Sequence, residues 1–164
     1  MRLAGVLCGV VLLSAVPAHA ATKYVATWGT DGAAGSIDAP WKTPNYALSH
    51  VACGDVILVR GGVYPSISTQ EVPSTSCSSY EAAVTLKAYP GEAVHMPTLS
   101  VLIEHYLIFQ DLILDGHPSP WGGETIIIGG GRPHGTGAGH LRLVNLDVHG
   151  NRIVPSTSSS AAVY

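Results

Sequence analysis

Apolar and polar residues alternate in two segments of the chain that align without a gap. Residues 106–116 read YLIFQDLILDG, and residues 140–150, thirty-four positions later, read HLRLVNLDVHG. Four apolar positions coincide in the two copies, and a period of two is typical of β-strands with one buried face. The two segments therefore indicate an internal repeat, and a repeat at this spacing predicts a stacked architecture.

The alternation slips at one position in each copy, where Asp111 aligns with Asn145. In the second copy, Leu143 and Leu146 are both apolar although two residues separate them. A chain that bends there through the left-handed backbone region keeps both halves facing one core, and Asn and Asp tolerate that region best after glycine. We therefore expect Asp111 and Asn145 to be corner residues whose side chains form a ladder along the stack.

A short helix and further strands after it are predicted. The segments VILV at 56–59, AVTLKAY at 83–89 and TIII at 125–128 have strand composition, and we expect 56–59 to be the first strand of the stack. Thr43 can cap a helix that has Pro44 at its first position and runs through Tyr46, Ala47, Leu48 and Val51. We expect this helix to cover the open end of the first strands, with Trp28 and Trp41 packed in the same region.

The first twenty residues have the pattern of a secretory signal peptide. A basic Arg2 precedes an apolar run, and small residues at Ala18 and Ala20 predict cleavage before Ala21. No later apolar run is long enough to span a bilayer, so we expect no membrane contact once residues 1–20 are removed. Residues 154–164 are polar and low in complexity, and we expect them to be a disordered tail. The predicted location is secreted or periplasmic.

The charge and the cysteine content bear on which partners the chain can bind and on the redox state of its compartment. Without Arg2 the chain carries seven Lys and Arg against eleven Asp and Glu, a formal charge of −4. No basic patch stands out, so the sequence predicts no nucleic-acid partner. Cys53 and Cys77 remain after cleavage; either they form a disulfide, which an oxidising compartment favours, or they are two buried inert thiols.

The corner and the N-terminal segment carry a resemblance to a known family. Residues 24–64 contain a strand, an Asp/Gly loop, the turn DAPWKT, the short helix and then GDVILVRGGVY. Together with the asparagine corner, this pattern resembles the right-handed parallel β-helix of the pectate-lyase-like superfamily over residues 24–152. The resemblance implies an all-β fold, a right-handed parallel β-helix (solenoid) with a short N-terminal capping helix, in which residues 21–153 form the cap and the first coils. Chains of this family are usually longer, so we expect an incomplete member whose open last coil can self-associate.

The resemblance also implies a chemistry. Lyases of this family that cut acidic polysaccharides hold calcium with clustered acids and use an Arg or Lys as base, so calcium is implied if the chain is a lyase. The repeat places Ile108 over Arg142, Ile113 over Asp147 and Asp115 over His149 on the outer face. The catalytic candidates are Asp115, Asp147, His149, Arg142 and Arg152. The alternative is an ordinary solvated link between Asp115 and His149.

Two further groups have competing interpretations. His134, His140 and His149 could form a zinc site, but their spacing matches no zinc motif. Trp121 is a candidate for stacking on a sugar ring, with a ring folded over the coil edge as its alternative.

Two classes of function therefore stay open. One is a secreted β-helix protein related to polysaccharide lyases and glycoside hydrolases, with an acidic polysaccharide as partner. The other is a noncatalytic carbohydrate-binding or cell-surface scaffold.

Overall fold

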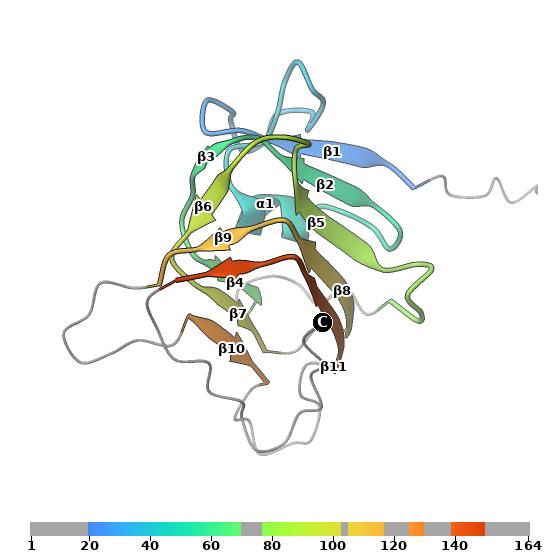
Figure 1. The fold of residues 1–164 in the computed structure, drawn as a ribbon. Helices are drawn as coiled ribbons and strands as arrows, with labels where there is room; N and C mark the ends of the chain where they lie inside the picture. Colours follow the sequence, from blue (N-terminus) through green and yellow to red (C-terminus); the bar gives the residue numbers. More distant parts are fainter. Residues whose placement is uncertain (1–19, 70–76, 103–104, 117–124, 130–138, 150–164) are drawn as a thin grey trace, which may run out of the picture.

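A computed structural model describes residues 20–69, 77–102, 105–116, 125–129 and 139–149. Within these ranges, the structure is all-β, with parallel sheets and one short helix (Figure 1). No helix among the described residues combines the length and the apolar character needed to cross a bilayer. The predicted signal peptide, the residues 150–153 at the end of the predicted coils and the predicted tail at 154–164 lie outside the described residues.

The strands form three parallel sheets. The first sheet contains β1 (Thr22–Val25), β2 (Val56–Val59), β5 (Val84–Ala88), β8 (His105–Gln110) and β11 (Gly139–Val144), in that order. The second contains β3 (Gly62–Val63), β6 (Val94–Met96), β9 (Ile113–Leu114) and β12 (Asp147–Val148). The third contains β4 (Ile67–Ser68), β7 (Leu99–Val101) and β10 (Ile126–Ile128).

The chain visits the three sheets in the same order several times. We use the word coil for one such passage: β2–β3–β4, then β5–β6–β7, then β8–β9–β10, and then β11–β12. Neighbouring strands within a sheet pair in parallel, so equivalent residues of successive coils lie side by side. The expectation that 56–59 begins the stack is wrong, because β1 pairs with β2 in register from Thr22 and Val56 onward. The strand expected at the start of residues 24–64 is therefore itself part of the stack.

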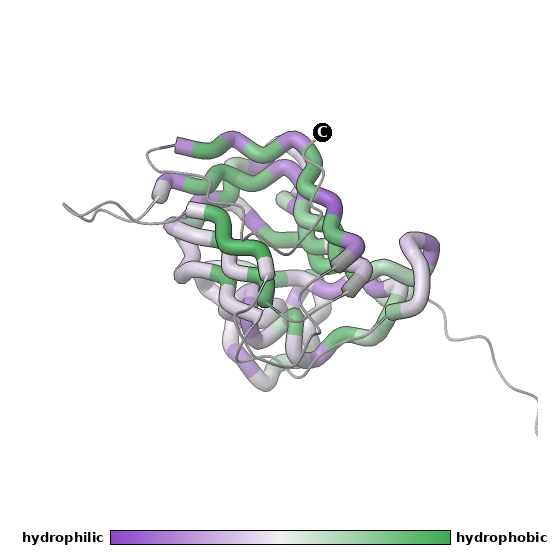
Figure 2. The backbone as a smooth tube through the Cα atoms, turned by 90° about the horizontal axis from the view of Figure 1, so that it is seen from below, coloured by the Kyte–Doolittle hydropathy of each residue, from purple (hydrophilic) through white to green (hydrophobic). Residues whose placement is uncertain are grey.

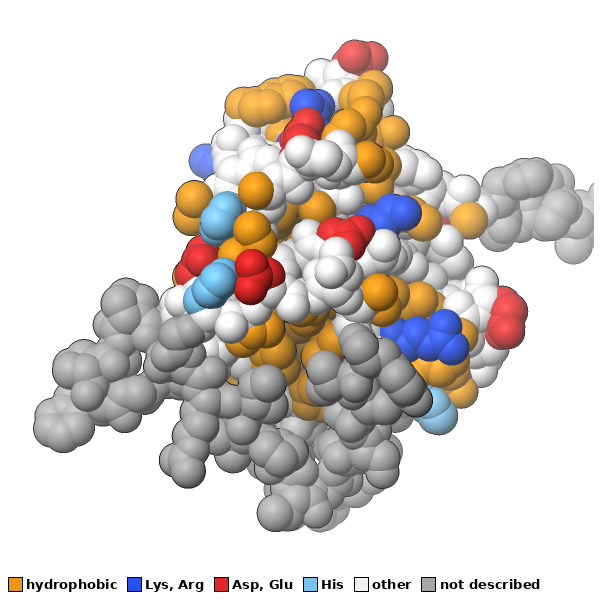
Figure 3. Space-filling model, viewed as in Figure 1, with side chains coloured by type: hydrophobic (Ala, Val, Ile, Leu, Met, Phe, Trp, Pro, Cys, Tyr) orange, Lys and Arg blue, Asp and Glu red, His pale blue; other side chains and the backbone are white. Residues whose placement is uncertain are grey.

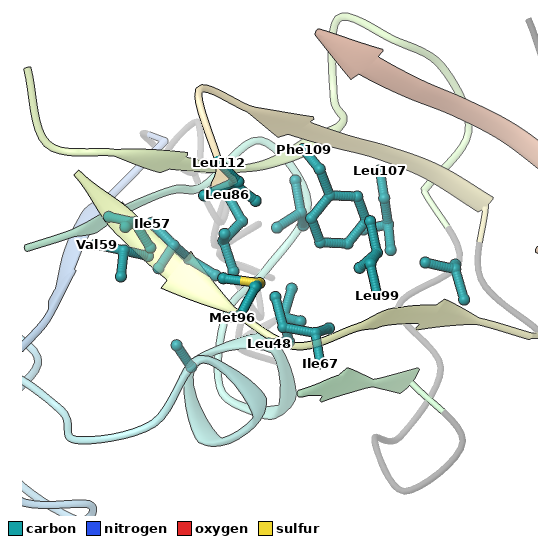
Figure 4. Close-up of a cluster of buried hydrophobic side chains, with 14 of the residues drawn as sticks. Leu48, Ile57, Val59, Ile67, Leu86, Met96, Leu99, Leu107, Phe109 and Leu112 are labelled. Atoms are coloured by element: carbon teal, nitrogen blue, oxygen red, sulfur yellow. The ribbon is translucent and has the colours of Figure 1, made fainter. Parts of the chain in front are cut away.

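The core lies between the three sheets and follows the predicted alternation. In β5 the residues Val84 and Leu86 are buried, whereas Thr85 and Lys87 are partly exposed. Figure 2 shows the same alternation of hydrophobic and hydrophilic positions along the strands. The centre of the core contains Leu48, Ile57, Val59, Ile67, Leu86, Met96, Leu99, Leu107, Phe109 and Leu112 (Figure 4). Burying such side chains is the main stabilising contribution to the fold, at about 1.5 to 3 kcal/mol for each large one.

Helix α1 (Pro44–Ser49) begins as predicted. The Thr43 hydroxyl accepts a hydrogen bond from the backbone N–H of Tyr46, and Pro44 lies in the first turn. The helix ends at Ser49, so Val51 is buried but lies beyond it. Its buried face includes Ala47 and Leu48, and the helix contacts β1, β2 and β4.

The loop before the helix is fixed by Asp31. Its Oδ1 accepts hydrogen bonds from the backbone N–H groups of Lys42 and Thr43, and its Oδ2 accepts one from the Thr43 hydroxyl. Trp41 is buried against this loop and donates from its indole N–H to the carbonyl of Ala33 at 2.7 Å. Trp41 is therefore a packing residue, as expected. Trp28 is not, because 62% of its surface is exposed.

Two kinds of side-chain contact join successive coils at the corner between the first and second sheets. In the last two coils, Asp111 and Asn145 have φ angles of 57° and 49°, and the Asn145 amide donates to Asp111 Oδ1 at 2.7 Å. In the first two coils, Arg60 donates from Nε to both carboxylate oxygens of Glu92, at 2.9 and 3.0 Å. Glu92 also accepts a hydrogen bond from the backbone N–H of Gly61, which joins the two coils at this edge.

Cys53 and Cys77 form a disulfide. It links the loop before β2 to the segment before β5, so it joins the first two coils outside the sheets. The stabilisation expected from closing a loop of this length is about 3.5 kcal/mol on the chain-entropy model.

Candidate functional site

The predicted candidates lie on two outer faces of the molecule. Arg142 is in β11 of the first sheet and is paired in register with Ile108. Asp147 is in β12 of the second sheet and is paired with Ile113. The registers predicted for Arg142 and Asp147 are therefore confirmed, but they place Arg142 on a different face from Asp147 and His149. The acids and the arginine do not converge on one site.

On the second sheet, two His–Asp pairs lie close together. His95 Nδ1 lies 3.0 Å from Asp115 Oδ2, and His149 Nε2 lies 3.1 Å from Asp147 Oδ1. The expected link between Asp115 and His149 is therefore wrong. Asp115 reaches back to His95 of the preceding coil, and His149 turns to the acid of its own strand. Figure 3 shows His and acidic side chains gathered beside β6, β9 and β12. All four side chains are at least one third exposed, so these pairs contribute little to stability.

On the first sheet, Arg142 contacts an aromatic residue from another coil. Its guanidinium carbon lies 3.8 Å from the centroid of the Tyr80 ring, within range of a cation–π interaction. No carboxylate in the described part of the chain lies within 4.0 Å of the Arg142 nitrogens. The ring orders a side chain that would otherwise be flexible, and Arg142 as a residue is exposed.

Two stacked rings extend this contact. Tyr106 and His140 occupy equivalent positions in β8 and β11, and their rings are parallel with centroids 4.4 Å apart. The Tyr80 ring meets Tyr106 edge to face at 5.3 Å and His140 at 6.3 Å. Tyr80, Tyr106, His140 and Arg142 form what we call the aromatic–Arg cluster. Figure 3 shows Lys or Arg, His and hydrophobic-class side chains together beside β8 and β11.

The backbone under the stacked rings is unusual. Tyr106 and His140 have φ angles of 60° and 56°, a region that non-glycine residues seldom adopt. Such conformations cost of order 1 to 3 kcal/mol each and gather at sites where they serve a purpose. The same deviation in two successive coils marks this edge of the sheet as a constrained element.

Glu81 adds a carboxylate beside the cluster. A hydrogen bond from Ser79, the backbone and then the positive charge of Arg142 hold the pKa of Glu81 below its usual value. Because its pKa is lowered and the residue is exposed, Glu81 stays ionised and available to hydrogen-bond donors from solvent. The aromatic–Arg cluster and Glu81 together present a cation, a group of aromatic rings and an anion.

Sequence reasoning found Arg142 and weighed His140 but missed Tyr80, Tyr106 and Glu81. Tyr80 and Glu81 belong to a segment without periodicity, so the alignment of coils did not place them. Tyr106 stands in the aligned repeat opposite His140, and that pairing of two rings was the available signal.

Calcium needs six to eight oxygen ligands, mostly from clustered acids. Among the described residues, no group of three or more His, Cys, Asp or Glu side chains could hold a metal ion. These residues therefore do not fit the implied calcium site. Arg152, Trp121 and His134 lie outside the described residues, so the stacking and zinc hypotheses are not tested.

Comparisons with known proteins give matches to parts of this chain. No family model matches the chain. Over 75 residues it is 39% identical to pectate lyase PEL9 of Emericella nidulans, a match that covers 46% of this chain. The same match covers 18% of the lyase, so the chain spans less than a fifth of that relative. A solved structure described as the complex of XylC with xylose is 33% identical over 45% of this chain and 11% of its own, with a TM-score of 0.38.

Proposed function

We propose that this chain is part of an exported, right-handed parallel β-helix protein, related to polysaccharide lyases, that binds acidic polysaccharide. The observation that carries the proposal is the likeness to a pectate lyase. The repeated passage of the chain through three parallel sheets supports the β-helix. The Cys53–Cys77 disulfide supports an oxidising compartment outside the cytosol.

The aromatic–Arg cluster is the surface best suited to such a ligand. A uronic-acid polymer carries one carboxylate on each sugar ring, and a guanidinium can bind a carboxylate through two parallel hydrogen bonds. Because Tyr80 already orders Arg142, less side-chain entropy is lost when the carboxylate binds. Glu81 can accept hydrogen bonds from sugar hydroxyls, and the rings of Tyr80 and Tyr106 offer apolar surface to the sugar.

Binding is the function that the described residues support best, and catalysis is the second candidate. A lyase must remove a proton next to the sugar carboxylate, and the relative's name supports this chemistry. In the described ranges, however, the acids Asp115 and Asp147 are paired with His95 and His149 on a different face from Arg142. Catalysis therefore has to be detected by its product.

The test is calorimetric titration of the protein with oligogalacturonates, with neutral xylo-oligosaccharides as the comparison ligand. We expect saturable binding of the acidic oligomers and at least about tenfold weaker binding by Arg142→Gln, because one charge-assisted contact is lost. Lys87→Gln is the matched control: it removes one positive charge from the outer face of the same sheet, and we expect a change of less than about twofold.

Each result has a distinct meaning. A wild-type protein that binds no acidic oligomer would reject the proposed function. Equal binding by wild type and Arg142→Gln would keep the function but move the site away from the cluster. A rise in ultraviolet absorbance from unsaturated product, measured with calcium in the same samples, would add lyase activity to binding.

A further inference from the structure

Asp55 is the one acidic or basic side chain that is buried within the described ranges, with 7% of its surface exposed. Its Oδ1 accepts a hydrogen bond from the backbone nitrogen of Ala21 at 2.7 Å, and its Oδ2 accepts one from the backbone N–H of Ala52 at 2.8 Å. No Lys, Arg or His of the described residues lies within 4.0 Å of it. A buried carboxylate without a cation is costly unless a positive charge is supplied.

The nitrogen that Asp55 contacts is the one that processing would release. The leader pattern predicts cleavage between Ala20 and Ala21, and Ala20 is exposed. In the unprocessed chain this nitrogen is a neutral amide, and it occupies the position that an α-ammonium group would occupy in the processed chain. The carbonyl of Ala21 also accepts a hydrogen bond from Val56, which fixes the residue at the start of β1.

We propose that Asp55 is the binding site for the N-terminal ammonium of the processed chain, so that removal of the leader completes a buried ion pair. Hydrolysis of the Ala20–Ala21 bond by a processing endopeptidase consumes one water. The hydroxyl goes to the Ala20 carbonyl carbon, giving a carboxylate on the released leader. The Ala21 nitrogen takes the remaining hydrogen of the water. It then takes one proton from solvent, which balances the proton that the new carboxyl group releases, and becomes the ammonium group.

The position of Asp55 makes this pair structural. Asp55 lies between the disulfide at Cys53 and the first residue of β2, and Ala21 immediately precedes β1. An ion pair between them would hold the first two strands of the first sheet together at their beginning, where Thr22 pairs with Val56. The leader would then weaken the fold until export is complete, because the carboxylate would have no counterion. This role is independent of the proposed polysaccharide binding.

The pair also predicts a pH dependence with a definite sign. An α-amino group titrates at about 8 in an unfolded chain, and the neighbouring carboxylate favours its charged form. Its folded-state pKa is thus raised, so the extra stability is complete below about pH 8 and is lost as the pH rises through the folded-state value. Lys23, two residues further along the chain, donates from Nζ to the carbonyl of Ala34 and forms no ion pair with Asp55.

Four chains test the proposal by urea unfolding at pH 6. One begins at Ala21, a second begins at Ala20, and the other two carry Asp55→Asn in each of these backgrounds. We expect the chain that begins at Ala21 to have an unfolding equilibrium constant at least about tenfold smaller than the one that begins at Ala20. We expect this difference to vanish with Asp55→Asn and above the pKa of the ammonium group.

A matched control separates the pair from general charge effects. Asp31→Asn also removes a carboxylate that accepts backbone hydrogen bonds, but Asp31 does not contact Ala21. The effect of the additional Ala20 on stability should therefore persist in this variant. Equal stability of the two wild-type chains, or a difference that survives Asp55→Asn, would overturn the proposal.

If the Asp55→Asn chains do not fold, the proposal is tested by the pKa of the α-amino group in the wild-type chain that begins at Ala21. Competitive acetylation of its α-amino group should give a pKa at least one unit above the value in urea. An unchanged value would contradict the pair.

Discussion

Asn145 donates a hydrogen bond from its side-chain amide to Asp111 Oδ1 at 2.7 Å, across thirty-four residues of sequence. Both residues adopt positive φ angles at the same corner of successive coils. These backbone conformations explain why the apolar alternation slips there. A residue that tolerates the left-handed region turns the chain from the first sheet to the second, and its side chain then joins the next coil.

Two substitutions separate the backbone and side-chain contributions of Asn145. We expect Asn145→Ala to cost about 1 to 2 kcal/mol, because it combines backbone strain with a lost hydrogen bond. Asn145→Gly should cost less, since glycine accepts the positive φ and loses only the side-chain bond. Urea unfolding measures both. An alanine variant as stable as the parent would show that the corner needs neither contribution.

The inward and outward assignment is tested by two neighbours in β8. Phe109 is fully buried, so Phe109→Ala should cost about 3 to 5 kcal/mol through lost burial and a cavity. Ile108 lies on the outer face beside Arg142, and Ile108→Ala should cost less than about 1.5 kcal/mol. Thermal or urea unfolding reports both values, and equal costs would contradict the assignment.

Reduction of the Cys53–Cys77 disulfide should weaken the fold without rearranging the strands. The double variant Cys53→Ser/Cys77→Ser is expected to lose about 3.5 kcal/mol, because the loop closed by the bond gains freedom in the unfolded state. Unfolding of the parent with and without reductant should give the same difference. If the parent resists reductant and the double variant keeps full stability, the bond does not contribute to the fold.

Tyr64 should make the fold sensitive to alkali. Burial raises its pKa to about 12, and its hydroxyl donates to the Arg60 carbonyl at 2.7 Å. Because the folded-state pKa is above the unfolded value of about 10, this stability is present below pH 10 and is lost as the pH rises toward 12. The expected loss is about 2 to 3 kcal/mol. This loss of stability at high pH should be absent in Tyr64→Phe. In the parent, tyrosinate absorbance reports the ionisation.

The sequence allowed two kinds of feature to be predicted: those that recur in the repeat with a fixed register, and a helix start that follows a capping pattern. The corner at Asp111 and Asn145, the cap at Thr43 and the pairing of Arg142 with Ile108 all follow from alternation or capping patterns. The strand register determines which residues of successive coils are neighbours, but it does not determine which side chains contact one another. Asp115 was expected to meet His149, and the rotation of its side chain instead brings it to His95.

Features outside the repeat were missed for a different reason. Trp28 was expected to pack, but the conformation of the Asp/Gly loop leaves it exposed while Trp41 occupies the buried position. Tyr80 contacts Arg142 from an irregular segment, so nothing in the alternation of apolar residues indicated that contact. Loop conformation and side-chain rotation depend on tertiary packing, which a single sequence does not specify.

The parallel stacking of successive coils is tested most directly by cysteine cross-linking between β5 and β8. Thr85 is paired with Ile108, and Lys87 is paired with Gln110. Adjacent strands are about 4.8 Å apart, within the range that a disulfide can bridge. Cysteines at either pair should therefore cross-link readily under mild oxidation, whereas the pair Lys87→Cys/Tyr106→Cys should not. Antiparallel strands would give a different result. Cysteines would then cross-link at Thr85 with Ile108 and at Lys87 with Tyr106, but not at Lys87 with Gln110. That result would contradict the stacked coils.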